Sequence, residues 1–119
     1  MPSVAVIGAS NTKAKFGNKA VRAYLRQGWT VYPVNPTEPE IEGLKAFRSI
    51  ADIPGPVDRA SLYLPPQIGI GVLDAIKAKG VTDVWVNPGA ESDALFAKAE
   101  QLGLETTFAC SIVDIGERP

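Results

Sequence analysis

Short apolar segments alternate with amphipathic ones along this chain, and this alternation restricts the possible folds more than any other feature. Largely apolar runs occur at residues 4–7, 29–32, 59–64, 84–86 and 104–108. Such runs, separated by segments with helical periodicity, are typical of parallel strands connected by helices. We predict an α/β fold: a single Rossmann-like three-layer domain over residues 1–119, with about five mostly parallel strands and helices on both faces of the sheet.

Three helices are expected between these strands, each with apolar residues three or four positions apart. The second begins at Pro65-Pro66, because proline fits the first position of a helix. Gly28, Gly80 and Gly103 follow the three helical patterns, where a left-handed C-terminal cap is most easily made. The apolar positions of the helices are Ala20, Val21, Tyr24 and Leu25; Ile68, Val72, Leu73 and Ile76; and Leu95, Phe96, Ala99 and Leu102.

The segment between the second and third strands has few regular features. Residues 33–39 contain three prolines and cannot form a regular helix. Residues 49–53 are expected to form a short helical turn before Pro54-Gly55-Pro56.

The charge and cysteine content exclude several classes of protein. Lys and Arg total 12 against 13 Asp and Glu, a formal net charge of -1, so no overall basic field attracts nucleic acid. Cys110 is the only cysteine, which excludes an intrachain disulfide and a cysteine metal cluster and suggests a reducing compartment, the cytoplasm. The N-terminal apolar run stops at Gly8 without a preceding basic region, so we expect neither a signal peptide nor a membrane span.

The residues after the first strand are suited to bind an anion. Gly8-Ala9-Ser10-Asn11 follow that strand and precede a helix, so small side chains let backbone N–H groups face a phosphate. Lys13 and Lys15 flank the loop and could pair with phosphates or simply be solvated. A plain strand-to-helix turn is the alternative. The loop is neither a dinucleotide fingerprint, since the next glycine is Gly17, nor a Walker A loop.

The end of the second strand argues against a nicotinamide dinucleotide. It reads Pro33-Val34-Asn35-Pro36, without the Asp or Glu that binds the ribose in NAD-binding domains. Glu38 follows only after two prolines.

The sequence offers no recognisable catalytic pair and no metal ligands in a binding pattern. It contains no histidine, so Cys110, Ser10, Ser61 and Ser111 lack the usual base. Cys110, at a strand end, is expected to be a small buried hydrophobic residue. No catalytic or metal-binding residue is therefore predicted, although the possibility of an enzyme stays open.

Six stretches occur in an order that resembles a known family. They are residues 6–10, 15–19, 33–36, 40–44, 85–91 and 110–112, which read Val-Ile-Gly-Ala-Ser, Lys-Phe-Gly-Asn-Lys, Pro-Val-Asn-Pro, Glu-Ile-Glu-Gly-Leu, Trp-Val-Asn-Pro-Gly-Ala-Glu and Cys-Ser-Ile. In these motifs the chain resembles the CoA-binding domain family, which includes the N-terminal domain of the succinyl-CoA synthetase α subunit and standalone bacterial and fungal proteins. The likeness covers nearly the whole chain.

The resemblance implies that the ligand is CoA or acyl-CoA, lying across the carboxyl edge of the sheet, where open α/β sheets generally bind ligands. The phosphates would be held by the first loop, the adenosine would lie at the end of the second strand, and the third and fourth strand ends would complete the site. In that order, the implied residues are Gly8, Ala9, Ser10, Asn11, Lys13 and Lys15; Asn35 and Pro36; and Leu64, Pro65, Val86, Asn87, Pro88 and Gly89.

The chain departs from the family pattern in two respects. The synthetases use a phosphorylated histidine on a further domain, and this sequence has no histidine, so ligase activity is not carried over. Related standalone sequences read Gly-Pro-Cys near the end, whereas Phe108-Ala109 precede Cys110 here.

Three functions are compatible with the sequence. The first is a non-catalytic CoA- or acyl-CoA-binding protein, whose partner is a small nucleotide ligand rather than nucleic acid or membrane. The second is a small Rossmann oxidoreductase or another nucleotide-cofactor enzyme, in which Ser10 or Tyr63 would act without a clear base. The third is a protein-interaction domain with a vestigial pocket. A homodimer is possible in each case.

Overall fold

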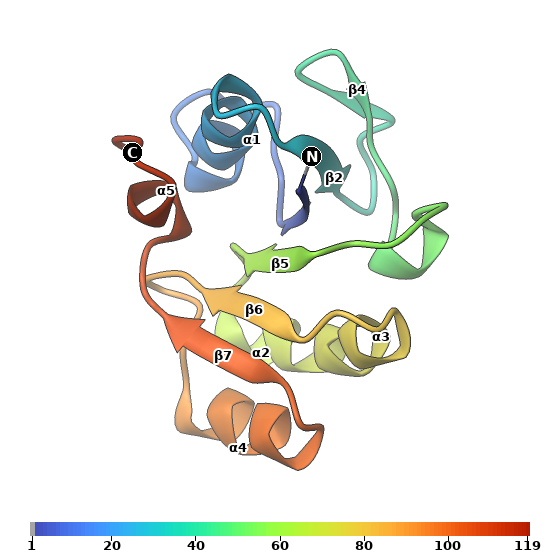
Figure 1. Ribbon diagram of the computed structural model, residues 1–119, viewed down its shortest axis with the longest axis vertical. Helices are drawn as coiled ribbons and strands as arrows, with labels where there is room; N and C mark the ends of the chain where they lie inside the picture. The colour runs from blue at the N-terminus through green and yellow to red at the C-terminus, as the bar shows by residue number, and fades with distance from the viewer. Residues whose placement is uncertain (1) are drawn as a thin grey trace.

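The chain folds around one parallel β-sheet. The computed structural model describes residues 2–119, and its main sheet contains β1 (Ser3–Ile7), β2 (Thr30–Val34), β5 (Arg59–Leu62), β6 (Asp83–Val86) and β7 (Glu105–Phe108). The strand order is β2-β1-β5-β6-β7, and every neighbouring pair is parallel (Figure 1). The predicted Rossmann-like α/β fold is confirmed.

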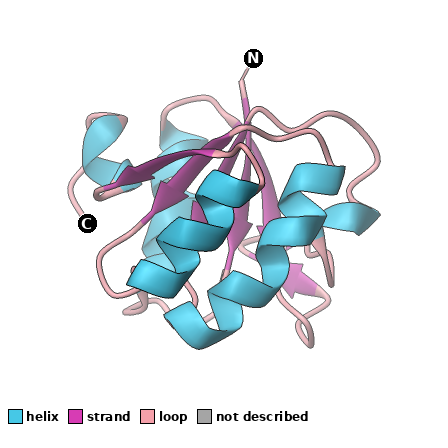
Figure 2. Cartoon of the chain, turned by 90° about the horizontal axis from the view of Figure 1, so that it is seen from below, coloured by secondary structure: helices cyan, strands magenta, loops and turns pink. Residues whose placement is uncertain are grey.

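Helices cover both faces of this sheet, as Figure 2 shows. Alternate side chains of the fully buried strand β1 point to opposite faces, so Val4 and Val6 belong to one apolar core, and Ala5 and Ile7 to the other. The first core lies under α1 (Phe16–Arg26) and α5 (Ser111–Asp114). The second lies under α3 (Leu73–Ala78) and α4 (Asp93–Gln101). No helix among residues 2–119 could span a bilayer.

The ends of the predicted helices agree with the structure, but the course of the second helix differs. Gly28, Gly80 and Gly103, which follow the helices, have positive φ values as expected for C-terminal caps. The second helix, however, is interrupted: α2 (Pro66–Gly69) passes through the 3-10 turn η2 (Ile70–Val72) into α3. This turn shifts the helical phase, because a 3-10 helix has fewer residues per turn.

The predicted buried faces of the helices were wrong at three positions. Leu25 is 39% exposed, Ile68 is 54% exposed and Phe96 is 45% exposed, so none of the three lies in the core. Ile68 precedes the phase shift at η2. The ring of Phe96 lies edge-on to that of Phe108 at 5.6 Å, outside the core.

The strands also begin and end differently from the prediction. β2 extends to Val34 and includes Pro33, which the edge of a sheet tolerates because one side of an edge strand needs no ladder donor. β5 ends at Leu62, so Tyr63 and Leu64 leave the sheet, and β7 begins at Glu105 instead of Leu104.

The segment between β2 and β5 contains an unpredicted hairpin. β3 (Glu40–Ile41) and β4 (Leu44–Lys45) pair antiparallel around a turn in which Glu42 and Gly43 have positive φ. The expected helical turn near residues 49–53 is the 3-10 helix η1 (Ile50–Asp52). The hairpin was missed because two-residue strands give no readable periodicity.

A buried network of polar groups attaches α5 to the sheet. The amide nitrogen of Asn87 donates to Ser61 Oγ at 2.9 Å and to the carbonyl oxygen of Leu62 at 2.8 Å. Its oxygen accepts the backbone N–H of Ser111 at 2.9 Å, and the hydroxyls of Ser61 and Ser111 lie 2.7 Å apart. Asn87 is thus the link between β5, β6 and the start of α5.

We predict that Asn87→Ala destabilises the fold. It leaves the Leu62 carbonyl and the Ser111 N–H buried without their side-chain partner, a cost of roughly 2–3 kcal/mol in unfolding free energy. Urea unfolding followed by circular dichroism measures this value. Gln101→Ala, at an exposed position of α4, serves as the control and should change it by less than about 0.5 kcal/mol. An equal effect of both changes would contradict the assigned role of Asn87.

Candidate functional site

A cavity of about 590 Å³ opens at the carboxyl edge of the sheet, where the loops after β1, β2, β5 and β6 meet. β1 lies between β2 and β5, so the strand order reverses here, and open α/β sheets bind ligands at such switch points. We call it the main cavity. Its lining residues are Gly8, Ala9, Ser10, Lys15, Phe16, Gly17, Asn35, Pro36, Tyr63, Leu64, Pro65, Pro88, Gly89 and Ala90.

The first two backbone amides of the loop after β1 are already used within the protein. The N–H groups of Gly8 and Ala9 both donate to the carbonyl oxygen of Val34, at 3.1 and 3.2 Å. The Thr12 N–H donates to Ser10 Oγ at 3.0 Å. Gly8 and Ala9 therefore shape the wall of the main cavity, while their N–H groups face β2.

Unpaired amides are instead found at the start of α1. Within residues 2–119, the N–H groups of Phe16 and Gly17 have no acceptor, and both residues line the main cavity. No side chain caps this helix, and its first turn contains no acidic residue. The positive end of the helix dipole is thus available to an anion.

The approach of α1 to the loop depends on two glycines. A Cβ atom on Gly17 would lie 2.1 Å from the Gly8 carbonyl oxygen. A Cβ atom on Gly8, whose φ is +97°, would lie 2.7 Å from the Tyr63 carbonyl oxygen. Backbone therefore packs directly against backbone from β1 to α1 and β5, which brings the helix N-terminus to the cavity.

The charge of the lining is simple. Lys15 is the one charged residue among the lining residues in the described part of the chain, and no carboxylate accompanies it. An anion at this site would meet a cation and a helix N-terminus without a nearby repelling group.

Asn35 organises the end of β2. Its amide nitrogen donates to the Ala9 carbonyl at 2.8 Å, and its oxygen accepts the N–H groups of Thr37 and Glu38, both at 2.9 Å. The side chain therefore ties β2 to the first loop and closes the following turn. Beyond Pro36 lies a second hollow of about 390 Å³, here called the β2 hollow, lined by Pro36, Thr37, Glu38, Pro39, Lys45, Ala46, Phe47, Arg48 and Asp52.

Tyr63 forms part of the opposite wall. Its hydroxyl lies 3.1 Å from Ser111 Oγ, which connects the cavity to the buried network around Asn87. Burial raises the pKa of Tyr63 to about 12, against the opposing effect of hydrogen bonds with Ser111 and Ser61. Tyr63 is therefore protonated at neutral pH and cannot act as a general base there.

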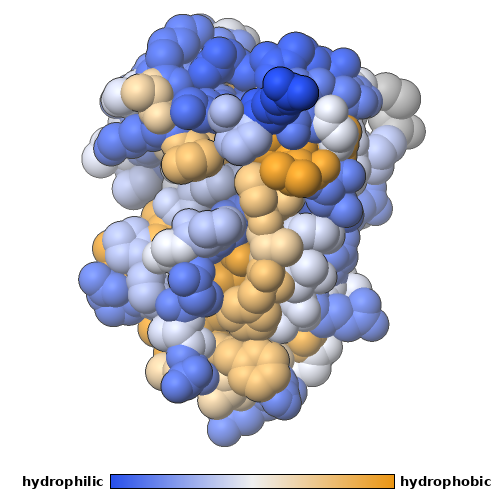
Figure 3. Space-filling model, turned by 90° about the vertical axis from the view of Figure 1, so that its left-hand side faces the viewer, coloured by the Kyte–Doolittle hydropathy of each residue, from blue (hydrophilic) through white to orange (hydrophobic). Residues whose placement is uncertain are grey.

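The rest of the cavity wall is largely apolar. Leu64 and Pro65 follow β5, and residues 88–90 follow β6. Figure 3 faces the edge toward which the arrowheads of β5, β6 and β7 point in Figure 1, and a band of hydrophobic surface runs down it toward the end that carries α4. The cavity thus combines one cationic, amide-lined end with a long apolar side.

Most residues implied by the resemblance line the main cavity, but four lie elsewhere. Asn11 donates to Glu38 and to the Glu40 carbonyl, and Lys13 bonds Glu42 at 2.8 Å. Val86 and Asn87 are buried. These four residues support the surroundings of the cavity, although Val86 also borders a neighbouring hollow.

The partner of Lys13 is held firmly in its charged state. The Lys13 ammonium and, secondarily, the Asn18 amide lower the pKa of Glu42 by hydrogen bonding to its carboxylate. This ion pair joins the first loop to the β3–β4 hairpin. Lys13 is 69% exposed and is not among the residues that line the main cavity.

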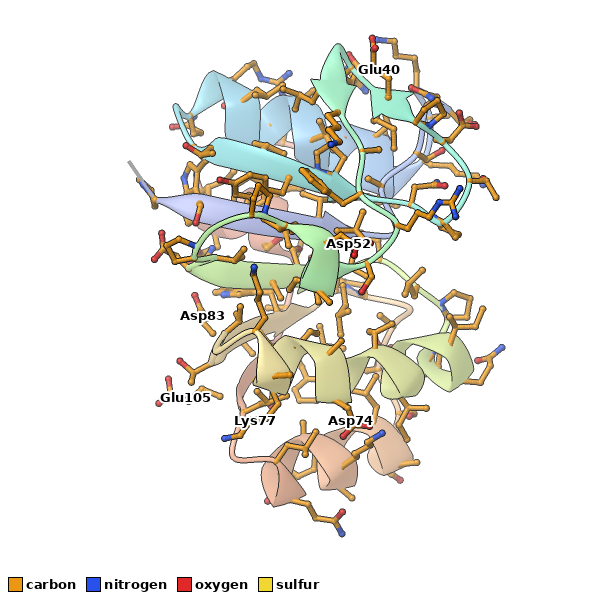
Figure 4. The ribbon with its side chains drawn as sticks, turned by 90° about the vertical axis from the view of Figure 1, so that its right-hand side faces the viewer. Glu40, Asp52, Asp74, Lys77, Asp83 and Glu105 are labelled. Atoms are coloured by element: carbon orange, nitrogen blue, oxygen red, sulfur yellow. The ribbon has the colours of Figure 1, made fainter. Side chains whose placement is uncertain are left out.

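The acidic residues labelled in Figure 4, and Cys110, do not gather around one cavity. Figure 4 labels Glu40, Asp52, Asp74 and Asp83, which lie on β3, η1, α3 and β6 rather than around one cavity. Cys110 is half-buried against the core beneath α1.

Sequence reasoning did not place Phe16, Gly17 or Ala90 at the cavity, and it considered Tyr63 only as an acting group of the enzyme alternative. The spacing of Gly8 and Gly17 was noted only as a departure from the dinucleotide fingerprint, yet the backbones approach so closely that a Cβ atom on Gly17 would lie 2.1 Å from the Gly8 carbonyl oxygen. Phe16 lies inside the matched stretch 15–19, but phenylalanine is a residue type expected in an apolar core rather than at a binding site.

The sheet order, the uncapped helix and the cavity define a Rossmann-like α/β domain with a cavity at its switch point. The chain belongs to the CoA-binding domain family, because the sequence model of that family, described as CoA binding domain, matches residues 2–115. This finding agrees with the resemblance noted in the motifs.

Individual relatives are similar to this chain in sequence and fold. The α subunit of acetate–CoA ligase (ADP-forming) II from Pyrococcus furiosus is 43% identical over 84 residues, which cover 70% of this chain and 18% of the relative. A conserved hypothetical protein from Pyrococcus furiosus has a TM-score of 0.88 and 36% identity, covering 96% of this chain and 99% of that one. The dinucleotide-forming acetyl-coenzyme A synthetase 1 of Ca. Korarchaeum cryptofilum, in complex with phosphate and ADP, has a TM-score of 0.80 and 32% identity, covering 90% and 25%. The chain thus spans less than a fifth of the ligase subunit.

We predict that Gly17→Ala disrupts the site. The added methyl group meets the Gly8 carbonyl, which belongs to the backbone and cannot move aside alone, so unfolding free energy should fall by about 2–3 kcal/mol. Gly71→Ala is a matched control, because a Cβ atom there meets nothing within 4 Å and φ is not positive. The control should be neutral or stabilising by a few tenths of a kcal/mol, roughly. Thermal melts of both variants test this, and a tolerated Gly17→Ala change would contradict the packing argument.

Proposed function

We propose that this chain binds CoA or acyl-CoA in the main cavity and does not itself catalyse a reaction of the bound molecule. The observation that carries the proposal is the uncapped N-terminus of α1, where the Phe16 and Gly17 amides and Lys15 face a cavity without carboxylates. The chain's membership of the CoA-binding domain family also supports the proposal.

The diphosphate of the ligand would lie against this helix end. Two unpaired amides and one lysine suit the negative oxygens of a diphosphate. Ser10 lies on the same cavity wall, and its Oγ already accepts the Thr12 N–H while its own proton is free to donate. Gly8 and Ala9 would contribute shape rather than hydrogen bonds.

The two ends of CoA differ in polarity, and the hollows on the two sides of the α1 N-terminus differ in polarity as well. The 3′-phosphoadenosine would lie toward Asn35 and Pro36 and enter the β2 hollow, which offers Phe47 beside Lys45 and Arg48 together with the acids Glu38 and Asp52. The pantetheine arm would run along the apolar wall formed by Leu64, Pro65 and Pro88.

The non-catalytic assignment rests on the groups available. The sequence has no histidine, and the high pKa of Tyr63 keeps this residue protonated. A phosphoryl-transferring ligase needs an acceptor for the phosphoryl group and a grip on a nucleoside triphosphate, neither of which these residues provide. The related ligase subunits contain much more chain than the part that resembles this one.

The second candidate is an oxidoreductase that binds a nicotinamide dinucleotide. It shares the fold and the switch-point cavity. Asn35, however, stands just after β2, where such domains place a ribose-binding carboxylate, and its amide is already committed to Ala9 and the following turn. This observation favours CoA.

The comparison of CoA with NAD tests the proposed function. At a CoA concentration of about 100 Kd the folded state gains roughly 2.7 kcal/mol, so Tm should rise by about 10 °C. NAD at the same concentration should raise Tm by less than about 2 °C, because we expect the folded protein to bind NAD much more weakly than CoA. Thermal-shift titrations measure both values. A larger shift with NAD, or no shift with CoA, contradicts the proposal.

The two lysines of the first loop should differ in their effect on CoA affinity. Lys15→Gln removes the cation that lines the cavity and should weaken binding by about five- to tenfold, a moderate loss because the site is partly open to solvent. Lys13→Gln is the matched control, since Lys13 pairs with Glu42, and it should leave affinity within about twofold. Isothermal titration calorimetry gives both dissociation constants. A greater loss in the Lys13 variant would reverse the assignment.

A further inference from the structure

Beyond Pro88 the carboxyl edge continues into two smaller hollows beside the end of β7. The first, of about 240 Å³, is lined by Val86, Pro88, Glu91 and Phe108. The second, of about 280 Å³, is lined by residues 91–93, Phe96 and Phe108. We call the two hollows together the β7 groove. Pro88 also lines the main cavity, so the groove and the proposed ligand site adjoin at this residue.

The groove exposes two aromatic rings to solvent. Phe96 is 45% exposed and Phe108 is 41% exposed, although they come from different elements, α4 and β7. Their centroids lie 5.6 Å apart at an interplanar angle of 60°. In Figure 3 the hydrophobic band reaches the lower part of this face, the end that carries α4. A groove that offers exposed aromatic rings at the end of a ligand cavity can take an apolar extension of that ligand.

Resting on the proposed function, we propose that the β7 groove is a subsite for the acyl group of an acyl-CoA, and that this group is neutral and apolar. The polarity of the main cavity sets the direction. With the diphosphate at the start of α1 and the adenosine at β2, the pantetheine arm follows Leu64, Pro65 and Pro88 toward β6. The thioester at its far end then reaches the hollow between Val86 and Phe108.

The charges around the groove narrow the class of acyl group. Glu91 and Asp93 line it, and the Glu91 carboxylate accepts the Gly89 N–H at 2.8 Å. No basic residue is among the lining residues that the structure describes there. A dicarboxylic acyl group, such as succinyl, would bring a second negative charge beside these acids, so the groove selects aliphatic or aromatic monocarboxylic acyl groups.

The test compares the dissociation constants of CoA, hexanoyl-CoA and succinyl-CoA by isothermal titration calorimetry. A methylene group that fully leaves water gains about fourfold in affinity. Because the groove is open on one side, we expect hexanoyl-CoA to bind about tenfold more tightly than CoA in total. Succinyl-CoA should bind no more tightly than CoA.

Variants separate the groove from the rest of the site. Phe108→Ser should bring the affinity for hexanoyl-CoA down to that for CoA while leaving CoA itself within about twofold. Leu25→Ser, which changes an exposed apolar residue on α1, is the control and should retain the acyl preference. Circular dichroism melts verify that both variants are folded. Phe96→Ala provides a second variant with the same expected loss.

Amide chemical shifts give an independent readout in the unmodified protein. Hexanoyl-CoA should shift the ¹H–¹⁵N signals of Glu91 and Phe108 beyond the positions that CoA produces. If CoA binds and hexanoyl-CoA shows neither tighter binding nor these shifts, the acyl subsite is wrong and the proposed function stands. If CoA itself does not bind, the proposed function is wrong and the subsite falls with it.

Discussion

The contact between the backbones of Gly17 and Gly8 is the constraint on which the functional end of the molecule depends. It sets how closely α1 approaches the first loop, and the second close contact, from Gly8 to the Tyr63 backbone, joins the same loop to β5. A side chain at either glycine would push these elements apart, because its Cβ atom would lie 2.1 Å (Gly17) or 2.7 Å (Gly8) from a backbone carbonyl oxygen. The N-terminal amides of α1 would then shift relative to the cavity wall. A fold common to many nucleotide-binding proteins would thus obtain the proposed anion site here through close backbone packing.

The loop after β1 divides its polar groups between structure and ligand. The Gly8 and Ala9 amides hold the end of β2 through a single carbonyl, and Asn35 returns a hydrogen bond to the Ala9 carbonyl. These bonds fix the loop before any ligand arrives, so little conformational entropy is lost when an anion binds. Lys13 is similarly committed to Glu42, which leaves Lys15 as the cation on the wall of the main cavity. Anion binding at this site would be weak at each group and depend on their fixed arrangement.

The sequence predicted the sheet, and a hollow at its carboxyl edge, better than the contacts of the individual residues. Runs such as residues 4–7 are readable because a buried parallel strand is apolar on both faces, and a site at the strand ends follows from topology. The hairpin formed by β3 and β4 was not readable, since two-residue strands have no period. Asn11, Lys13 and Asn87 are residue types that often bind ligands. In the structure they form hydrogen bonds with Glu38, Glu42 and Ser111, which lie 24 or more residues away in the chain. Pairings of that kind arise only when the fold brings distant segments together.

The connection from β6 to α4 illustrates how one short segment serves the core and the surface at once. Asn87 points inward and holds β5 and α5, while Pro88, Gly89 and Ala90 form the cavity wall directly after it. Glu91 then bonds the Gly89 amide, and Ser92 caps α4 through the Leu95 N–H. The inward bonds of Asn87 attach this segment to β5 and α5, so the same residue that stabilises the core also positions the wall of the cavity. A ligand that crosses Pro88 would therefore meet a wall whose place is set by the buried network, which lowers the conformational cost of binding its far end.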